Sequence, residues 1–191
     1  MNSRAWMIGL LVVMAIICSS ALAFVNIKIA PIIEKNQKIT YMRTVLNVFG
    51  VPYDIINQDS IIQTYQEHIK ERQENGLTLF DEQKTHATAI SLEGSGFQGH
   101  ISLVVALAGD TITGFKVVSQ EETPGLGARI TGEAFQKSFV GKKVSKGITM
   151  VKSGNAGPAQ FDAITGATET SKALEKILNR GFKLYFEAVQ K

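Results

Sequence analysis

The stretch Asp162-Ala163-Ile164-Thr165-Gly166-Ala167-Thr168-Glu169-Thr170-Ser171 leads directly into the most regular helical pattern of the chain. Apolar residues then recur at steps of three and four, which is the spacing of one helical face: Leu174, Ile177, Leu178, Phe182, Tyr185 and Val189. We therefore expect Thr168 at or beside the helix start, where the first backbone N–H groups lack intrahelical partners. Such an end carries partial positive charge and favours a bound phosphate.

Local physics alone favours an ordinary cap for this helix, because Thr and Ser are common N-cap residues. Gly166 and Ala167 have almost no side chain, so a ligand can approach the backbone closely. The loop by itself leaves both interpretations open, and the rest of the chain has to decide between them.

The run Ala5–Val25 contains no charged residue and is long enough to cross a bilayer as a helix. A cleaved signal peptide is the main alternative, because Arg4 precedes the run and Ala21-Leu22-Ala23 matches an Ala-x-Ala cleavage site. A lipoprotein is disfavoured, since a large Ile17 precedes Cys18. We expect a retained anchor, because the run exceeds a signal core of roughly 7–15 residues.

Composition excludes several classes of protein. Hydrophobic residues make up 45% and charged residues 19% of the 191 residues, as in an apolar segment attached to a soluble domain. The net charge is +3, and the Lys and Arg residues are scattered without interleaved aromatics, so we expect no nucleic-acid binding. Cys18 is the only cysteine, which excludes a disulfide framework, a CxxC motif and an iron–sulfur site. The three histidines, His68, His86 and His100, show no ligand spacing; we expect them at the surface or at edges, and no metal site.

Helices and strands can be predicted between these two ends. One helix is expected over residues 31–49, ended by Gly50 and Pro52. A second is expected over Ser60–Asn75, capped by Asp59 or Ser60 and closed by Gly76. The remaining expected elements are strands over 88–92, 100–107, 111–119 and 147–151, and a short helix over 131–140.

Two further loops contain unusual motifs. Gly94-Ser95-Gly96-Phe97-Gln98-Gly99 joins two expected strands, and Glu121-Glu122-Thr123-Pro124-Gly125-Leu126-Gly127-Ala128 follows the next one. Taken singly, the first is an ordinary glycine loop and the second is a type II turn at Pro-Gly. The second loop also offers backbone donors, an apolar side chain and a carboxylate.

All three motifs resemble those of the covalent FMN-binding domain family. The family has Asp-x-x-Ser/Thr-Gly-Ala-Thr, here Asp162 to Thr168, with Thr165 where many relatives have Ser. It also has Gly-x-Gly-aromatic-x-Gly-x-Ile, here with Phe97 and Ile101, and Glu-Thr-Pro-Gly-Leu-Gly, which this chain holds intact at 122–127. The domain occurs in the G subunit of Rnf complexes and in the C subunit of sodium-translocating NADH:quinone reductases.

The resemblance implies an α+β fold, with a single N-terminal transmembrane helix followed by a mixed helix and antiparallel-sheet FMN-binding domain. The expected membrane anchor covers residues 1–25 and the extracytoplasmic FMN-binding domain covers 26–191. Within the domain, N-terminal helices are expected over about 30–75 and the FMN core over about 85–190.

The resemblance also implies the site. Thr168 would carry FMN through a phosphoester bond as a phosphothreonyl flavin, and Asp162, Thr165, Gly166 and Ala167 would shape the attachment loop. Five further residues would bind the ring or the ribityl chain: Gly99, Glu122, Thr123, Leu126 and Gly127. No catalytic residue or metal ligand is implied; magnesium and FAD belong to the separate flavin transferase that makes the bond.

As a function, the resemblance implies an electron-carrier subunit of a membrane-bound ion-translocating ferredoxin:NAD oxidoreductase, with no catalytic turnover of its own. Its partners would be the other subunits, the flavin transferase and the lipid bilayer of the cytoplasmic membrane. Size favours Rnf over the corresponding quinone reductase protein, which is usually longer. Alternatives are that reductase protein, a membrane-anchored flavin-binding sensory or maturation protein, and a hydrolase with Thr168 as nucleophile, which lacks a nearby histidine base.

We predict that Ala5–Val25 is retained as a transmembrane helix and that the FMN-binding domain lies outside the cytoplasm, as in the family. A cysteine placed in that domain should react with a membrane-impermeant thiol reagent in intact cells. Labelling that occurs only after lysis would contradict this orientation.

Overall fold

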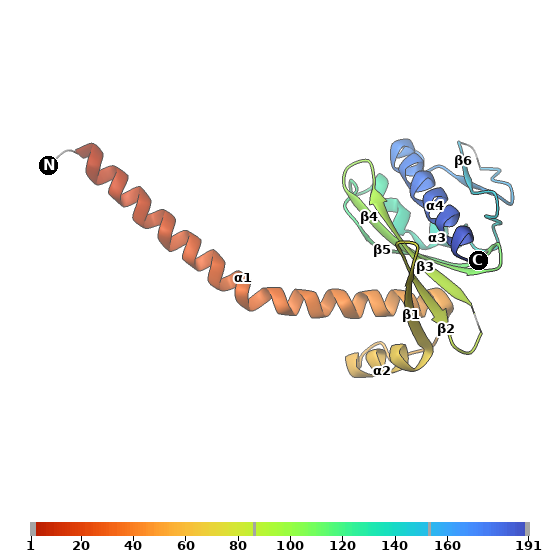
Figure 1. Ribbon diagram of the computed structural model, residues 1–191. Helices are drawn as coiled ribbons and strands as arrows, with labels where there is room; N and C mark the ends of the chain where they lie inside the picture. The colour runs from red at the N-terminus through yellow and green to blue at the C-terminus, as the bar shows by residue number, and fades with distance from the viewer. Residues whose placement is uncertain (1–2, 86, 153, 190–191) are drawn as a thin grey trace. The chain divides into compact units, whose positions relative to one another are not determined.

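The computed structural model describes residues 3–85, 87–152 and 154–189 (Figure 1). His86 and the outermost residues of the predicted anchor and domain lie outside the described residues. The chain divides into two compact units, Met1–Ile39 and Thr40–Lys191, and each is described by itself. The predicted boundary between anchor and domain at residue 25 stays a prediction.

The N-terminal helix α1 runs from Ser3 to Phe49 and contains Pro31 in its interior. The two helices expected over 5–25 and 31–49 are therefore one helix, although Pro31 cannot donate a backbone hydrogen bond within it. Gly50 ends the helix with φ of +68°, a conformation that favours glycine. An 18-residue window with a mean hydropathy of 2.7 makes α1 the one helix, among the described residues, that is long and apolar enough to cross a membrane.

The second unit is built on a five-stranded antiparallel sheet in which the strand order follows the chain order. Its strands are β1 (Ile69–Glu74), β2 (Leu77–Glu82), β3 (Thr88–Ser95), β4 (His100–Ala108) and β5 (Thr111–Gln120). Two short strands, β6 (Thr149–Val151) and β7 (Gln160–Asp162), pair in parallel beside it. The predicted strands over 88–92, 100–107, 111–119 and 147–151 are thus confirmed as β3 to β6, whereas β2 and β7 were not predicted.

The helix predicted over Ser60–Asn75 is wrong in its second half. Helix α2 covers only Gln58–His68, and its cap is Asn57, whose side-chain oxygen accepts hydrogen bonds from the N–H groups of Asp59 (3.0 Å) and Ser60 (3.3 Å). Residues 69–74 are β1 instead, because Asn75 and Gly76 both have positive φ and form a tight hairpin to β2. An Asn-Gly pair with this geometry matches the twist of two antiparallel strands, and here it outweighs helical spacing.

The helix predicted over 131–140 is also shorter than expected. The 3-10 helix η1 covers Gly127–Thr131, and helix α3 covers Glu133–Lys137. Gln136 of α3 is buried; its side chain accepts a hydrogen bond from the N–H of Val117 at 3.2 Å and donates one to the carbonyl of Thr131. This short helix therefore closes the outer edge of β5.

Helix α4 (Thr168–Val189) packs on one face of the sheet (Figure 1). Five of the six residues of its predicted apolar face are buried, and only Val189 is exposed. The approach of helix to sheet is close at Gly181, where a Cβ would lie 2.2 Å from Leu92. The strands supply the other half of this core from alternate positions, including Leu79, Ile90, Leu103 and Val105.

The last turns of α1, from Thr40 onward, cover the opposite face of the sheet. Tyr41 meets the ring of Phe80 edge-on at 5.8 Å between centroids. A Cβ on Gly114 of β5 would lie only 2.2 Å from the carbonyl oxygen of Val48, so glycine is needed there. The sheet is therefore buried on both faces, which makes the last turns of α1 part of the domain rather than only a linker.

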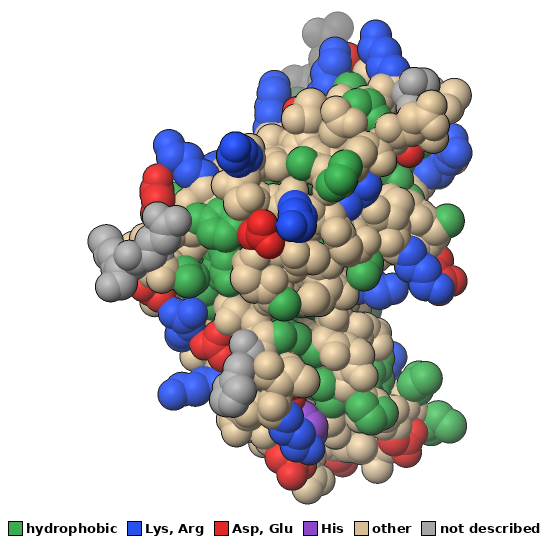
Figure 2. Space-filling view, turned by 90° about the vertical axis from the view of Figure 1, so that its right-hand side faces the viewer, with side chains coloured by type: hydrophobic (Ala, Val, Ile, Leu, Met, Phe, Trp, Pro, Cys, Tyr) green, Lys and Arg blue, Asp and Glu red, His purple; other side chains and the backbone are tan. Residues whose placement is uncertain are grey.

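Charge is distributed unevenly over this unit. Residues 137–191 contain ten Lys and Arg against four Asp and Glu, whereas residues 40–136 contain six against twelve. In Figure 2 the Lys and Arg side chains gather mostly over the upper part of the face shown, at the height of α4 and β6 in Figure 1. The last 55 residues, which include α4 and β6, are thus basic, and the preceding part of the domain is acidic.

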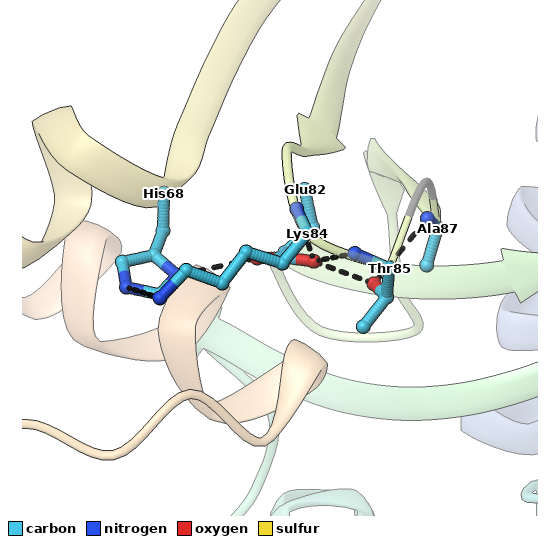
Figure 3. Close-up of polar contacts among 5 residues, drawn as sticks. All are labelled: His68, Glu82, Lys84, Thr85 and Ala87. Atoms are coloured by element: carbon cyan, nitrogen blue, oxygen red, sulfur yellow. Dashed lines mark hydrogen bonds and ion pairs between the residues drawn. The ribbon is translucent and has the colours of Figure 1, made fainter.

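A buried carboxylate closes the β2–β3 connection (Figure 3). Glu82 accepts hydrogen bonds from the hydroxyl of Thr85 at 2.6 Å, from the N–H groups of Thr85 and Lys84, and from His68 Nδ1 at 3.2 Å. Burial raises the pKa of Glu82, but these hydrogen bonds outweigh burial and hold the pKa at about 2, below its ordinary 4.5. His68, expected at the surface, is therefore only partly exposed.

We predict that Glu82 makes the domain sensitive to acid. Because its pKa is lower in the folded than in the unfolded chain, its contribution is complete above pH 4.5 and is lost as the pH falls towards about 2. Denaturant unfolding of the detergent-solubilised protein should show the free energy of unfolding of the wild type falling towards that of Glu82→Gln over this range. Parallel curves for the two proteins would contradict the prediction.

Candidate functional site

The three motifs found in the sequence meet around one cavity of about 360 Å³. One wall comes from the β3–β4 turn, a second from the segment after β5, and the third from the loop and first turn of α4. The lining residues are Phe97, Gln98, Glu122, Thr123, Leu126, Gly127, Gly166, Ala167, Thr168, Glu169 and Thr170. Cavities of roughly 300–1,000 Å³ are typical for small organic ligands.

Glu122 connects the three walls. Its Oε1 accepts hydrogen bonds from the N–H groups of Phe97 (2.6 Å) and Gln98 (3.1 Å). Its Oε2 accepts one from the hydroxyl of Thr170 at 2.7 Å. Glu122 is only 6% exposed; its hydrogen bond to Thr170 is buried, where such a bond is stronger than in water, and its two bonds to the β3–β4 turn are partly buried.

The attachment loop turns sharply before α4. The N–H of Ala167 donates to the carbonyl of Ile164 at 2.9 Å, and Gly166 between them has φ of +82°. The carbonyl of Ala167 accepts the first helical bond, from the N–H of Ser171 at 3.0 Å. Thr168 is therefore the first residue inside the helix and not its cap.

Ser171 fixes this loop from inside the helix. Its fully buried hydroxyl donates to the carbonyl of Ala167 and accepts from the N–H of Ile164, both at 3.0 Å. The loop is thus held at both ends by one side chain. Its shape is set by the protein itself before any ligand binds.

The four hydroxyl groups of the motif have different surroundings. Thr170 and Ser171 are buried and hydrogen-bonded, as described above, and Thr165 is exposed. Thr168 is half-buried and lines the cavity, and its hydroxyl makes no hydrogen bond to the described residues. Of the four, Thr168 alone combines contact with the cavity and a hydroxyl free to react.

Seven of the ten site residues expected from the sequence line the cavity: Glu122, Thr123, Leu126, Gly127, Gly166, Ala167 and Thr168. The other three, Gly99, Asp162 and Thr165, do not line it. Thr165 contributes its carbonyl oxygen, which accepts a bond from Arg129 at 3.1 Å. Gly99 closes the β3–β4 turn, its carbonyl accepting from the N–H of Gly96 at 2.7 Å.

Asp162 is half-buried at the end of β7, and one of its carboxylate oxygens is buried without a hydrogen-bond partner among the described residues.

Four residues that line the cavity were not predicted from the sequence: Phe97, Gln98, Glu169 and Thr170. Phe97 was noticeable as the aromatic residue of the glycine loop, and its 60% exposure leaves the ring available at the mouth of the cavity. Thr170 gave no signal, because its role depends on Glu122, 48 residues away.

These residues fit a flavin phosphate. The first turn of a helix presents backbone N–H groups and partial positive charge. Gly166 leaves the backbone open, with only Leu126 within 4 Å of where a Cβ would lie. The described residues contain no cluster of three or more His, Cys, Asp or Glu side chains able to hold a metal ion.

Comparison with known proteins agrees with this geometry. The family model for the FMN-binding domain matches residues 96–183. The G subunit of the proton-translocating ferredoxin:NAD(+) oxidoreductase complex of Clostridium ljungdahlii is 40% identical over 94 residues, 49% of this chain and 50% of that protein. The G subunit of the ion-translocating oxidoreductase complex of Methanosarcina acetivorans is 44% identical over 86 residues, 44% of this chain and 43% of that protein.

A solved structure extends the likeness over most of the fold. The crystal structure of the C subunit of Na(+)-translocating NADH-quinone reductase from Parabacteroides distasonis aligns with a TM-score of 0.68 and 25% identity, covering 81% of this chain and 93% of that one. The chain spans about half the length of the curated relatives it matches.

Fold and site together define an α+β flavin-binding domain that follows a long apolar helix. Residues 96–183 match the family model for the FMN-binding domain, the family that the three motifs resemble, and the chain is similar to G subunits of ion-translocating oxidoreductase complexes and to a quinone reductase C subunit.

We predict different stability effects for two hydroxyls only three residues apart. Ser171→Ala should lower the free energy of unfolding by about 1–3 kcal/mol, because it leaves the buried N–H of Ile164 unpaired. Thr168→Val should change it by less than about 0.5 kcal/mol, because valine keeps the shape and no hydrogen bond is lost. Chemical denaturation of the flavin-free protein measures both, and equal losses would show that the Thr168 hydroxyl has a structural role.

Proposed function

We propose that the chain carries FMN in a phosphoester bond to Thr168 and serves as an electron-carrier subunit of a membrane-bound ion-translocating oxidoreductase complex. The observation that supports this most is the convergence of three motifs on one cavity, which Thr168 lines with an uncommitted hydroxyl. Relatives named as G subunits of such complexes support the complex as a whole.

Covalent attachment of FMN would require transfer of its phosphoryl group to the hydroxyl of Thr168. Oγ1 of Thr168 would bond to the FMN phosphorus of FAD, with AMP as the leaving group and a base of the flavin transferase as the acceptor of the hydroxyl proton. The half-buried position of Thr168 leaves its hydroxyl within reach of a second protein. In the attached state Gly166 and Ala167 give room for the phosphate, and the N–H groups of the first turn of α4 stabilise its charge.

The other lining residues would hold the organic part. Leu126 and Phe97 are both exposed apolar side chains at the mouth, at 46% and 60%, and a flavin ring between them would bury them. Thr123 and Gly127 would lie along the ribityl chain or ring. When bound, FMN supplies one- and two-electron transfer, while the protein contributes orientation and electrostatics. Asp162 and Thr165 would shape the loop from behind.

We further propose that α1 anchors the domain in the cytoplasmic membrane as a single span, with the FMN-binding domain outside the cytoplasm. The apolar window of α1 supports the span, and the family resemblance supports the side. A covalent bond suits a carrier outside the cell membrane, where a dissociated cofactor would be lost. Other subunits of the complex and the surrounding lipid would be its partners.

Because the fold resembles that of a quinone reductase C subunit, a second candidate function is that of a subunit of a sodium-translocating NADH:quinone reductase. Affinity purification of the tagged chain from native membranes separates the two. Copurification with a ferredoxin-dependent NAD reductase indicates the first, and copurification with a quinone-reducing complex indicates the second. Isolation without other membrane subunits would favour a sensory or maturation protein.

We predict that Thr168→Val abolishes the covalent flavin, because valine has the same shape but no hydroxyl. Thr168→Ser should retain flavin if the transferase requires only the oxygen. Each variant would be coexpressed with the flavin transferase, run on a denaturing gel and viewed under ultraviolet light. Mass spectrometry of the tryptic peptide containing residues 162–172 then locates the adduct.

The matched controls are three neighbouring hydroxyls of the same motif. Thr165→Ala, Thr170→Ala and Ser171→Ala should each keep at least some flavin. An adduct in the Thr168→Val protein, or one mapped to another residue, would contradict the assignment to Thr168. The complete absence of flavin from the wild type, even with the transferase present, would contradict the proposed function.

A further inference from the structure

Among the described residues, the Glu122 side chain is the one that is hydrogen-bonded to both the β3–β4 turn and the first turn of α4, and this suggests a role different from flavin contact. We propose that Glu122 is a positioning residue, which holds the β3–β4 turn and the first turn of α4 at the separation that the flavin requires. The inference rests on the proposed function for the reason why this separation is needed, but the hydrogen bonds of Glu122 can be tested in the flavin-free protein.

The first step concerns the acceptor capacity of the carboxylate. Three donors already bind it, two backbone N–H groups at Oε1 and the hydroxyl of Thr170 at Oε2. Its own N–H donates to the side chain of Gln120 at 2.6 Å. A group so occupied and only 6% exposed is oriented towards the protein and has little capacity left for a ligand.

The second step concerns two glycines of the motifs. A Cβ on Gly96 would lie 2.1 Å from Oε1 of Glu122, and a Cβ on Gly127 would lie 2.5 Å from Oε2. The carboxylate therefore occupies the space that side chains at these positions would need. Glu122 therefore contributes to the need for glycine at both positions, together with Ile101 and the carbonyl of Gly99 at Gly96 and with the hydroxyl of Thr170 at Gly127.

The third step concerns what would happen without the carboxylate. The N–H groups of Phe97 and Gln98 sit in a turn whose only internal bond, among the described residues, is the one from Gly96 to Gly99. Loss of the acceptor would leave these N–H groups unpaired and release the turn from α4. Phe97 would then lose its fixed position at the mouth of the cavity.

Hydrogen exchange in the flavin-free protein, made without the transferase, tests this directly. In Glu122→Ala the amides of Phe97 and Gln98 should exchange roughly tenfold faster or more than in the wild type, since local opening becomes easier. Glu122→Gln should keep exchange within about threefold, because the amide oxygen still accepts from both N–H groups and its NH₂ can donate to Thr170.

Glu121→Ala is the matched control, because it removes a neighbouring carboxylate that accepts only from the N–H of His100, at 3.2 Å, among the described residues. It should accelerate exchange at His100 and leave Phe97 and Gln98 unchanged. Unchanged exchange at Phe97 and Gln98 in Glu122→Ala would overturn the proposal, as would equal acceleration by Glu121→Ala. If Glu122→Ala does not fold, Glu122→Gln decides: near-wild-type exchange supports the proposal, and tenfold acceleration overturns it.

Flavin loading gives an independent readout. With the transferase present, covalent flavin per chain should fall roughly tenfold in Glu122→Ala, stay within about threefold in Glu122→Gln and be unchanged in Glu121→Ala. Recovery by glutamine separates positioning from a need for negative charge; a loss in Glu122→Gln as severe as in Glu122→Ala would overturn the proposal. If no protein, wild type included, takes up flavin, the proposed function fails while the exchange experiment still decides the role of Glu122.

Discussion

The Glu122 carboxylate is the constraint on which the site depends. It lies in a loop between β5 and η1, yet it fixes a turn 25 residues before it and a helix start 48 residues after it. The sheet and α4 bring these segments near one another through the apolar core, but hydrophobic contact is non-directional and does not set their spacing. Directional hydrogen bonds to one buried acceptor set this spacing. In the same way, the hydroxyl of Ser171 fixes the distance between Ile164 and Ala167 in the attachment loop.

Much of the fold could be predicted from periodicity and turn chemistry. The face of α4 and the strands β3 to β5 follow patterns that depend on nearby residues alone, and they were confirmed. The error at residues 69–75 arose because Ile61, Ile62, Tyr65 and Ile69 continue a helical spacing through a segment that pairs with β2. The sign of the hairpin, Asn75-Gly76, was present but was interpreted as a helix end. Strand β2 was missed together with the hairpin that joins it to β1, and β7 depends on its parallel pairing with β6, which no local pattern contains.

The site was predictable only through its motifs. Local physics at Thr168 indicated an ordinary cap, whereas the structure places the residue inside the helix with its hydroxyl towards a cavity. The three sequence motifs together indicated the family and the chain segments that meet around the cavity. They did not indicate what each residue does there: Thr170 and Gln98 were missed, Gly96 was interpreted as part of an ordinary glycine loop, and Gly127 was interpreted as a flavin contact. Their actual neighbour is a carboxylate, and such a relation exists only after folding.

The separation of charge between the two parts of the domain has a consequence for encounters with other molecules. A domain whose last 55 residues are basic and whose preceding part is acidic has an uneven charge distribution, and it turns in the field of a charged surface before contact. An acidic redox partner would meet the basic part first and at a higher rate. This preference would weaken as added salt shortens the Debye length to about 10 Å at 0.1 M, so the direction of approach is itself under ionic control.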